Sequence, residues 1–166
     1  MKWWPWIVIA AAVLMSKKST RSPGNWSQDF SLEEFISPGD RATIPQEYVS
    51  NLQALVANVL QPARTKLGLP IRINSAYRNP QKNAAIGGVP NSQHITGQAA
   101  DIAPVPATLE NYKKLWDILV AGNYDQVIWE RAKAFTGKPS HLHVSYNPGN
   151  NRKKKLQYLN GSYSYI

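Results

Sequence analysis

The chain has 166 residues and a formal net charge of +9, with 43% hydrophobic and 17% charged residues. This length and balance suit one globular domain with an appendage, and a domain of this size buries a usable core without covalent cross-links. Because the chain has no cysteine, disulfide frameworks and thiolate metal sites are excluded, and any metal ion must be held by His, Asp or Glu.

The N-terminal residues 1–16 are predominantly apolar, with lysines on both sides of the run from Trp3 to Met15. As a helix this run would extend about 20 Å, which is shorter than the roughly 30 Å hydrocarbon core of a bilayer and typical of a signal-peptide core. We expect it to export the chain or anchor it to the membrane, which places the domain in the cell envelope; a buried core element is the alternative. Whether the segment is cleaved stays open. Residues 17–28, rich in Ser, Lys, Pro and Gly, are expected to be a linker.

The segments that follow place helices first and strands later. Ser31–Glu34 resembles a capping box that opens a short helix, and a longer helix is expected from Pro45 to Gly68, kinked or restarted at Pro62. Further elements are expected from periodicity and turn residues: strands at 71–75, 99–103, 126–130 and 141–146, and helices at 79–86 and 109–120. This order indicates an α+β domain over residues 29–150.

The C-terminal residues 151–166 are expected to be a basic, Tyr-containing tail, with a cluster of positive charge at Arg152–Lys155. A basic surface attracts polyanions such as an anionic wall polymer, a membrane surface or a nucleic acid; a solvated basic tail is the plainer interpretation. The chain has no helix-turn-helix pattern and no RNA-binding aromatic signature, so we expect no nucleic-acid partner.

Of the three histidines in the chain, the first lies in a segment of small and polar residues. His94 precedes Asp101 by seven residues, with Gly97 between them. A glycine allows a tight turn, so that a loop histidine and a strand aspartate can converge. Asp101 lies in an apolar strand, where a buried carboxylate needs a metal ion or a cation as its partner. The alternative is an aspartate that caps a turn, beside a surface histidine.

The other two histidines, His141 and His143, are two residues apart in an expected strand and therefore face the same side. They suit one metal ligand and one group beside the metal; two solvent-facing histidines on an edge strand are the alternative. Glu130 closes an apolar strand, either as a surface terminus or as a carboxylate facing a site. Arg78 follows a strand and suits carboxylate binding or oxyanion stabilisation, with a structural salt bridge as the competing role.

Four segments resemble, in this order, the signature segments of the zinc D-alanyl-D-alanine carboxypeptidase family: SAYRNPQKN (75–83), GGVPNSQHITGQAADI (87–102), YDQVIWE (124–130) and PSHLHVSY (139–146). FSLEEFI and LQPARTKLG are also similar to the opening of the family, so the likeness covers about residues 29–146. This family includes phage endolysin peptidases and shares its fold with the hedgehog signalling domain. The resemblance implies a small antiparallel sheet packed against helices.

Carried over residue by residue, the resemblance implies one zinc ion bound by His94, Asp101 and His143, with water in the fourth position. His141 matches a histidine that lies beside the metal and helps to stabilise the transition state. Arg78 matches the arginine that binds a substrate carboxylate or polarises the carbonyl.

Glu130 matches the acid that ends the DQxIxE strand and is the candidate general base. The chain departs from several relatives, which carry an acid three residues before the last ligand, where this chain has Ser140. The resemblance implies a monomeric zinc metallopeptidase that hydrolyses peptidoglycan stem or cross-link peptides, as a carboxypeptidase or an endopeptidase. A non-catalytic, zinc-containing cell-wall binding module and an anchored basic adaptor with incidental histidines are the alternatives.

Overall fold

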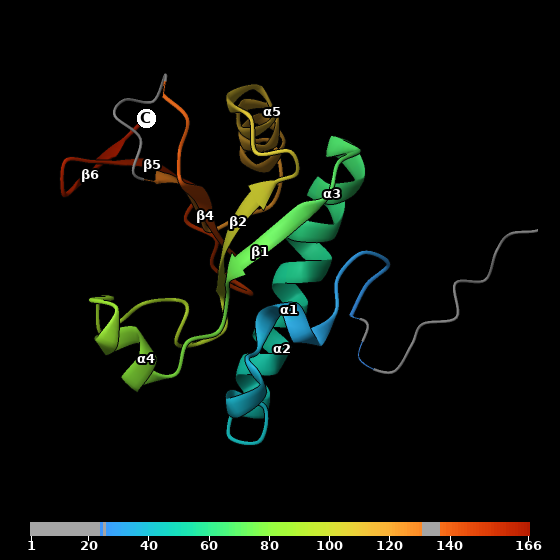
Figure 1. The fold of residues 1–166 in the computed structure, drawn as a ribbon, viewed down its shortest axis with the longest axis vertical. Coiled ribbons are helices and arrows are strands. Elements are labelled where there is room, and N and C mark those ends of the chain that lie inside the picture. The colour runs from blue at the N-terminus through green and yellow to red at the C-terminus, as the bar shows by residue number, and fades with distance from the viewer. Residues whose placement is uncertain (1–23, 25, 131–136) are drawn as a thin grey trace, which may run out of the picture.

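The computed structural model describes residue 24, residues 26–130 and residues 137–166 (Figure 1). The apolar segment 1–16 and most of the expected linker lie outside the described residues, so their predicted roles stay predictions. Within the described part of the chain, no helix combines the length and the apolar character needed to cross a membrane.

Most of the helices precede the strands. The helical elements are α1 (Leu32–Phe35), the 3-10 turn η1 (Pro38–Asp40), α2 (Gln46–Leu55), the π-helical turn η2 (Val56–Leu60), α3 (Gln61–Leu67), α4 (Pro80–Ala85) and α5 (Leu109–Val120). Of these, α2, η2 and α3 run on from one another as one long rod. Pro62 lies in the first turn of α3, and the π-helical turn η2 comes just before it. A proline has no N–H for the helical ladder and its ring displaces the preceding turn, so the helix is interrupted here. Gly68 ends α3 in the left-handed conformation, at φ +68°. The expected helix from Pro45 to Gly68 is therefore confirmed, with its restart at the proline.

The strands form one six-stranded sheet in the order β1-β2-β4-β3-β5-β6. Their bounds are β1 Ile71–Ser75, β2 Ala99–Pro104, β3 Gln126–Glu130, β4 His141–Ser145, β5 Lys154–Leu159 and β6 Ser162–Tyr165. All neighbouring pairs are antiparallel except β3 and β5, which are parallel. The α+β class is confirmed, and the sheet is mixed because β5 joins it in parallel.

The segment expected as a basic tail, residues 151–166, contains β5 and β6 (Figure 1). Its lysines obscure an alternation in which Leu156 and Tyr158 share one face of β5. Strand β3 presents backbone donors and acceptors along its second edge, and β5 satisfies them, pairing Ile128 with Leu156 and Glu130 with Tyr158. The description of this segment as a tail is therefore corrected.

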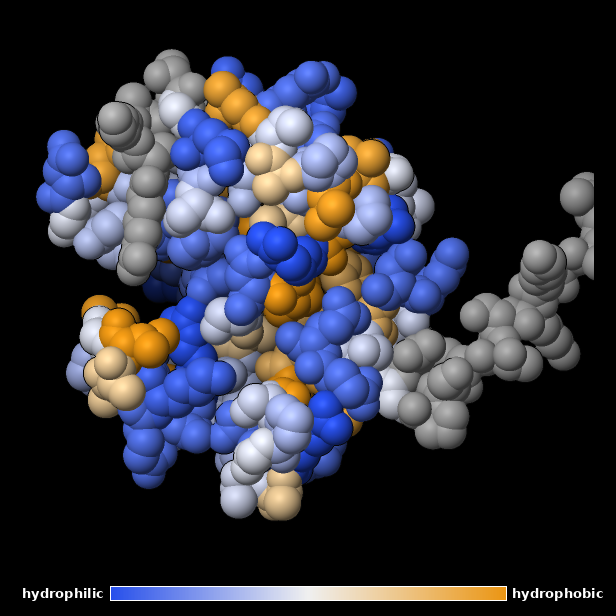
Figure 2. Space-filling view, in the orientation of Figure 1, coloured by the Kyte–Doolittle hydropathy of each residue, from blue (hydrophilic) through white to orange (hydrophobic). Residues whose placement is uncertain are grey.

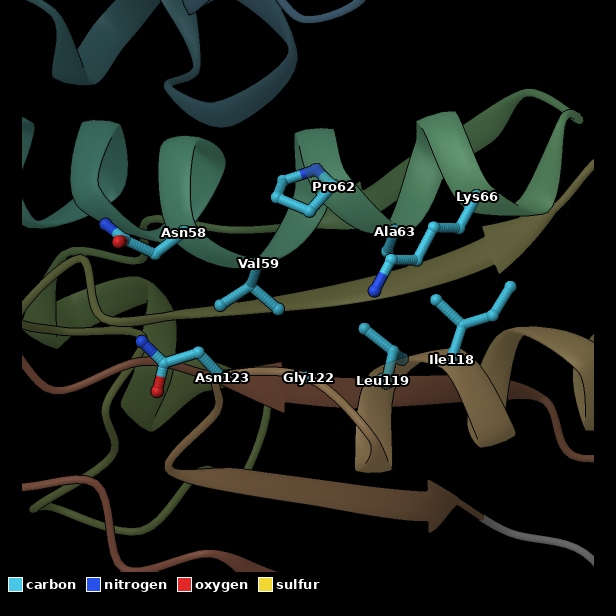
Figure 3. Close-up of a pocket in the computed structure, with 9 residues that line it drawn as sticks. All are labelled: Asn58, Val59, Pro62, Ala63, Lys66, Ile118, Leu119, Gly122 and Asn123. Carbon is cyan, nitrogen blue, oxygen red and sulfur yellow. The ribbon is translucent and has the colours of Figure 1, made fainter.

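The sheet has one apolar face, which packs against the α2–α3 rod and α5. Side chains of this face are fully buried in the core: Ile102, Val127, Trp129, Leu142 and Val144. Because side chains alternate along a strand, the residues between them point to the opposite face. A separate pocket lies between α3 and the end of α5, lined by Val59, Pro62 and Leu119 among others (Figure 3). None of the candidate site residues lines it.

Candidate metal centre

Strand pairing brings the candidate residues to one face of the sheet. Asp101 on β2 lies directly opposite His143 on β4, and Glu130 on β3 lies opposite His141. Residues directly opposite each other share a face, and so do residues two apart on one strand. The expectation that His141 and His143 face the same side is therefore confirmed. Figure 2 shows the molecular surface hollowed between the α4 end and the β5–β6 end, with hydrophilic surface inside the hollow.

His94 reaches this face from the loop before β2, and Gly97 makes the loop possible. Gly97 adopts φ +70°, and a Cβ atom at this position would lie 2.3 Å from the backbone oxygen of Tyr48 on α2. The side-chain amide of Asn51, also on α2, donates to the backbone oxygen of Thr96 at 3.0 Å. The loop therefore passes in direct contact with α2 and turns tightly enough for His94 to approach Asp101.

Three donor atoms from separate segments converge. The distance from His94 Nε2 to His143 Nδ1 is 3.2 Å, from His94 Nε2 to Asp101 Oδ1 3.2 Å, and from His143 Nδ1 to Asp101 Oδ1 3.1 Å. Zinc bonds of roughly 2.0–2.1 Å in a tetrahedron place neighbouring donor atoms about 3.3 Å apart. Two imidazoles and one carboxylate at this spacing form a group that could hold a metal ion.

The hydrogen bonds behind the donor atoms also suit a cation. His94 Nδ1 lies 2.7 Å from the backbone oxygen of Ala76. A carbonyl oxygen only accepts, so Nδ1 carries a hydrogen, which leaves Nε2 of the neutral ring available as a metal ligand. Burial of Asp101 raises its pKa, but hydrogen bonds from His143 and His94, and the positive charge of these rings when protonated, outweigh burial and hold that pKa well below its usual value. Zinc would take the place of those ring protons, because it requires an ionised carboxylate and imidazole lone pairs as donors.

Arg78 forms an ion pair with the second carboxylate oxygen of Asp101. Its Nε donates to Ser75 Oγ at 2.9 Å, and its backbone N–H donates to the backbone oxygen of His94 at 3.2 Å. The guanidinium therefore connects β1 to the carboxylate, and the backbone of Arg78 connects both to the His94 loop. The structural salt bridge is the contact observed, and binding of a substrate carboxylate or carbonyl by Arg78 stays a prediction.

His141 lies beside the three donor residues. Its Nε2 is 3.6 Å from Asp101 Oδ1, its Nδ1 is 2.9 Å from Ser140 Oγ, and its side chain is 20% exposed. Ser140 is held through its backbone: its N–H donates to the Glu130 carbonyl at 3.0 Å, and its carbonyl accepts from the Tyr112 hydroxyl at 3.1 Å. The His141 imidazole is thus close to the metal group without belonging to it.

Glu130 ends β3 with its side chain on the same face and is 7% exposed. The hydroxyl of Tyr163 on β6 donates to Glu130 Oε1 at 3.5 Å. Burial and the nearby Glu130 charge raise the pKa of Tyr163 to about 12. This tyrosine was not singled out from the sequence, because its place opposite Glu130 depends on the pairing of three strands.

A second set of residues that was not identified from the sequence, around buried Asp125, stabilises the loop that carries His94. Asp125 directly precedes β3, is fully buried, and accepts from the backbone N–H and Nε of Arg152, at 2.8 and 2.9 Å. Gln93, which precedes His94, donates to the same carboxylate at 2.9 Å. Burial raises the pKa of Asp125, but the hydrogen bonds from Arg152 outweigh it and lower that pKa. The available signals were Asp125 in the YDQVIWE segment and the basic cluster that begins at Arg152.

One comparison with known proteins, that with protein-family models, found a match. No curated protein matches the chain. A family model described as Peptidase M15, a zinc-dependent family, matches residues 29–144. The matched range includes all six candidate site residues and ends before β5. The resemblance noted in the sequence is thereby confirmed, and the chain belongs to the peptidase M15 family.

Proposed function

We propose that the chain is a zinc metallopeptidase that hydrolyses peptidoglycan stem or cross-link peptides. The observation that carries the proposal is the convergence of His94 Nε2, Asp101 Oδ1 and His143 Nδ1 at 3.1–3.2 Å in a peptidase M15 chain. The substrate class is supported by the four segments that resemble zinc D-alanyl-D-alanine carboxypeptidases. The apolar residues 1–16 support a place in the cell envelope.

The proposed roles divide among the residues on the site face. His94, Asp101 and His143 would hold the zinc ion, which when bound would supply a water of lowered pKa and a Lewis acid for the scissile carbonyl. Glu130 takes a proton from the attacking water and passes it to the leaving amine. Its burial at the end of β3 suits this role, because a fixed base transfers protons within hydrogen-bond reach.

Two hydrogen-bond donors, the Arg78 guanidinium and the His141 imidazole, lie beside the carboxylate of Asp101. Both suit the negative charge that develops on the substrate oxygen. His141 directs Nε2 toward this carboxylate, and Arg78 carries further N–H groups besides the one that binds Asp101. Donors placed in advance stabilise such a charge strongly. A substrate carboxylate bound at Arg78 makes the enzyme a carboxypeptidase, whereas a peptide that runs past Arg78 makes it an endopeptidase.

The test is hydrolysis of defined muropeptides by the full chain, with zinc and with a chelator, followed by mass spectrometry of the products. We expect zinc-dependent cleavage, and the product masses identify the bond. Glu130→Gln should retain zinc and lose about 10²–10⁴-fold in turnover, while Glu110→Gln, the same change at an exposed helix position, should behave as wild type.

Zinc binding without cleavage of any muropeptide would favour the non-catalytic binding module. Absence of bound zinc would refute both the enzyme and the module. Wild-type cleavage by Glu130→Gln would place the general base elsewhere.

A further inference from the structure

We propose that Tyr163 is a positioning residue that orients the carboxylate of Glu130, and that the β5–β6 hairpin is part of the active site. The proposal rests on the proposed function, because it gives Tyr163 a role that acts through the proposed base. The Peptidase M15 match ends at residue 144, so the hairpin, residues 154–165, lies beyond the part of the chain that the family model covers.

The sheet register places the hairpin next to the base. Tyr158 on β5 lies opposite Glu130 on β3, and Tyr163 on β6 lies opposite Tyr158. Residues directly opposite each other across neighbouring strands share a face, so these three side chains follow one another across the site face. The rings of Tyr158 and Tyr163 pack at a centroid distance of 4.6 Å. The Tyr163 ring therefore packs on Tyr158, the residue that lies between it and Glu130 in the sheet.

The hydroxyl of Tyr163 reaches Glu130 although Tyr158 separates the two in the sheet. Its oxygen is 3.5 Å from Glu130 Oε1, and Tyr163 is 55% exposed while Glu130 is 7% exposed. The contact therefore joins a buried carboxylate to a tyrosine that is mostly exposed. A phenol is protonated at neutral pH and donates, whereas an ionised carboxylate only accepts. Tyr163 is therefore the donor and Glu130 the acceptor in this hydrogen bond.

A glutamate side chain loses about 1.5–2 kcal/mol of rotamer entropy when it is fixed, so each contact that restricts Glu130 helps to keep the base near the reacting proton. A base works within hydrogen-bond reach, and small displacements of a catalytic group lower the rate strongly. A hydroxyl that holds Oε1 from one side reduces this freedom without altering the metal group. The effect of losing it should therefore fall on kcat rather than on substrate binding.

The experiment compares steady-state kinetics on a defined muropeptide for the zinc-loaded full chain and its variants. Tyr163→Phe should lower kcat about tenfold, as expected for one hydrogen bond to a charged group, with KM within about twofold of wild type. Tyr165→Phe makes the same change on the same strand, at a residue that is 70% exposed, and should leave both constants unchanged.

A double-mutant cycle tests whether Tyr163 acts through Glu130. Glu130→Asp keeps a carboxylate but withdraws it from the hydroxyl by one methylene, so Tyr163→Phe should have no further effect on kcat in that background. A tenfold loss in both backgrounds would overturn the proposal, as would wild-type kcat for Tyr163→Phe. Coupling of the two residues in urea unfolding without any kinetic effect would make the contact structural and would also overturn it. Turnover by wild type decides the proposed function separately, because the proposal concerns only the ratios among variants.

Discussion

Arg152→Ala tests whether the buried carboxylate of Asp125 braces the loop that carries His94. In the wild type, Asp125 is fully buried and accepts hydrogen bonds from the Arg152 guanidinium, the backbone N–H of residue 152 and Gln93. The substitution removes the guanidinium and leaves an ionised carboxylate in the interior with an amide side chain and one backbone amide as partners. Such a carboxylate is poorly compensated, so the variant should be less stable.

The magnitude follows from the burial of the two partners. Removing one partner of a buried ion pair costs about 3–5 kcal/mol, but the Arg152 side chain is 41% exposed, and water can partly replace it. We therefore expect a loss of about 2–3 kcal/mol in the free energy of unfolding. Because Gln93 precedes His94, zinc affinity should also fall, by about tenfold. The matched control is Lys114→Ala, which breaks an exposed pair with Glu110 and should cost less than about 0.5 kcal/mol.

The assay is urea unfolding of the metal-free chains from pH 7 down to about pH 3. Arg152 keeps the folded-state pKa of Asp125 lowered. The stability from this pair is therefore present above the unfolded pKa of about 3.9 and is lost as the pH falls through the folded pKa. The difference in the free energy of unfolding between wild type and Arg152→Ala should therefore become smaller at acid pH. A loss below about 1 kcal/mol at pH 7, or an equal loss across the pH range, would refute the reasoning.

Two further predictions concern the metal centre. Asp101→Ala should abolish zinc retention after gel filtration, measured by elemental analysis, because one of three converging donors is removed; wild-type stoichiometry would show that the ion lies elsewhere. Gly97→Ala should lower the free energy of unfolding by at least about 2 kcal/mol more than Gly68→Ala does. Both glycines have φ near +70°, but only at Gly97 would the new Cβ meet a backbone oxygen, that of Tyr48 at 2.3 Å. Equal losses in urea unfolding would mean that the close approach to α2 is unimportant.

Much of the metal centre could be predicted because its signals are local. Residues two apart on a strand share a face, so the His-x-His pattern placed His141 and His143 together before any pairing was known. Gly97 between His94 and Asp101 indicated a tight turn, and the structure places that glycine in the left-handed region against α2. The helix at 109–120 was also confirmed, since its amphipathic pattern begins after the N-cap Thr108.

The contributions of the C-terminal segment could not be predicted because they depend on non-local pairing. Strand β5 pairs in parallel with β3, and the paired residues are more than twenty positions apart in the sequence. Nothing in the local pattern of Lys154–Leu159 specifies which strand it pairs with. The contact between Tyr163 and Glu130 needs that pairing and the β5–β6 pairing together. The position of Arg152 beside buried Asp125 likewise exists only once this segment returns to β3.

The register of β4 connects the core to the metal centre. The alternation that turns His141 and His143 to the site face turns Leu142 and Val144 to the core, where both are fully buried. A shift of β4 by one residue would exchange the two sets. It would expose two apolar side chains, each contributing about 1.5–3 kcal/mol by burial, and would bury imidazoles without partners. Apolar packing on one face therefore fixes the register that places His143 opposite Asp101 on the other, so the donor geometry depends on the core as well as on the donor residues.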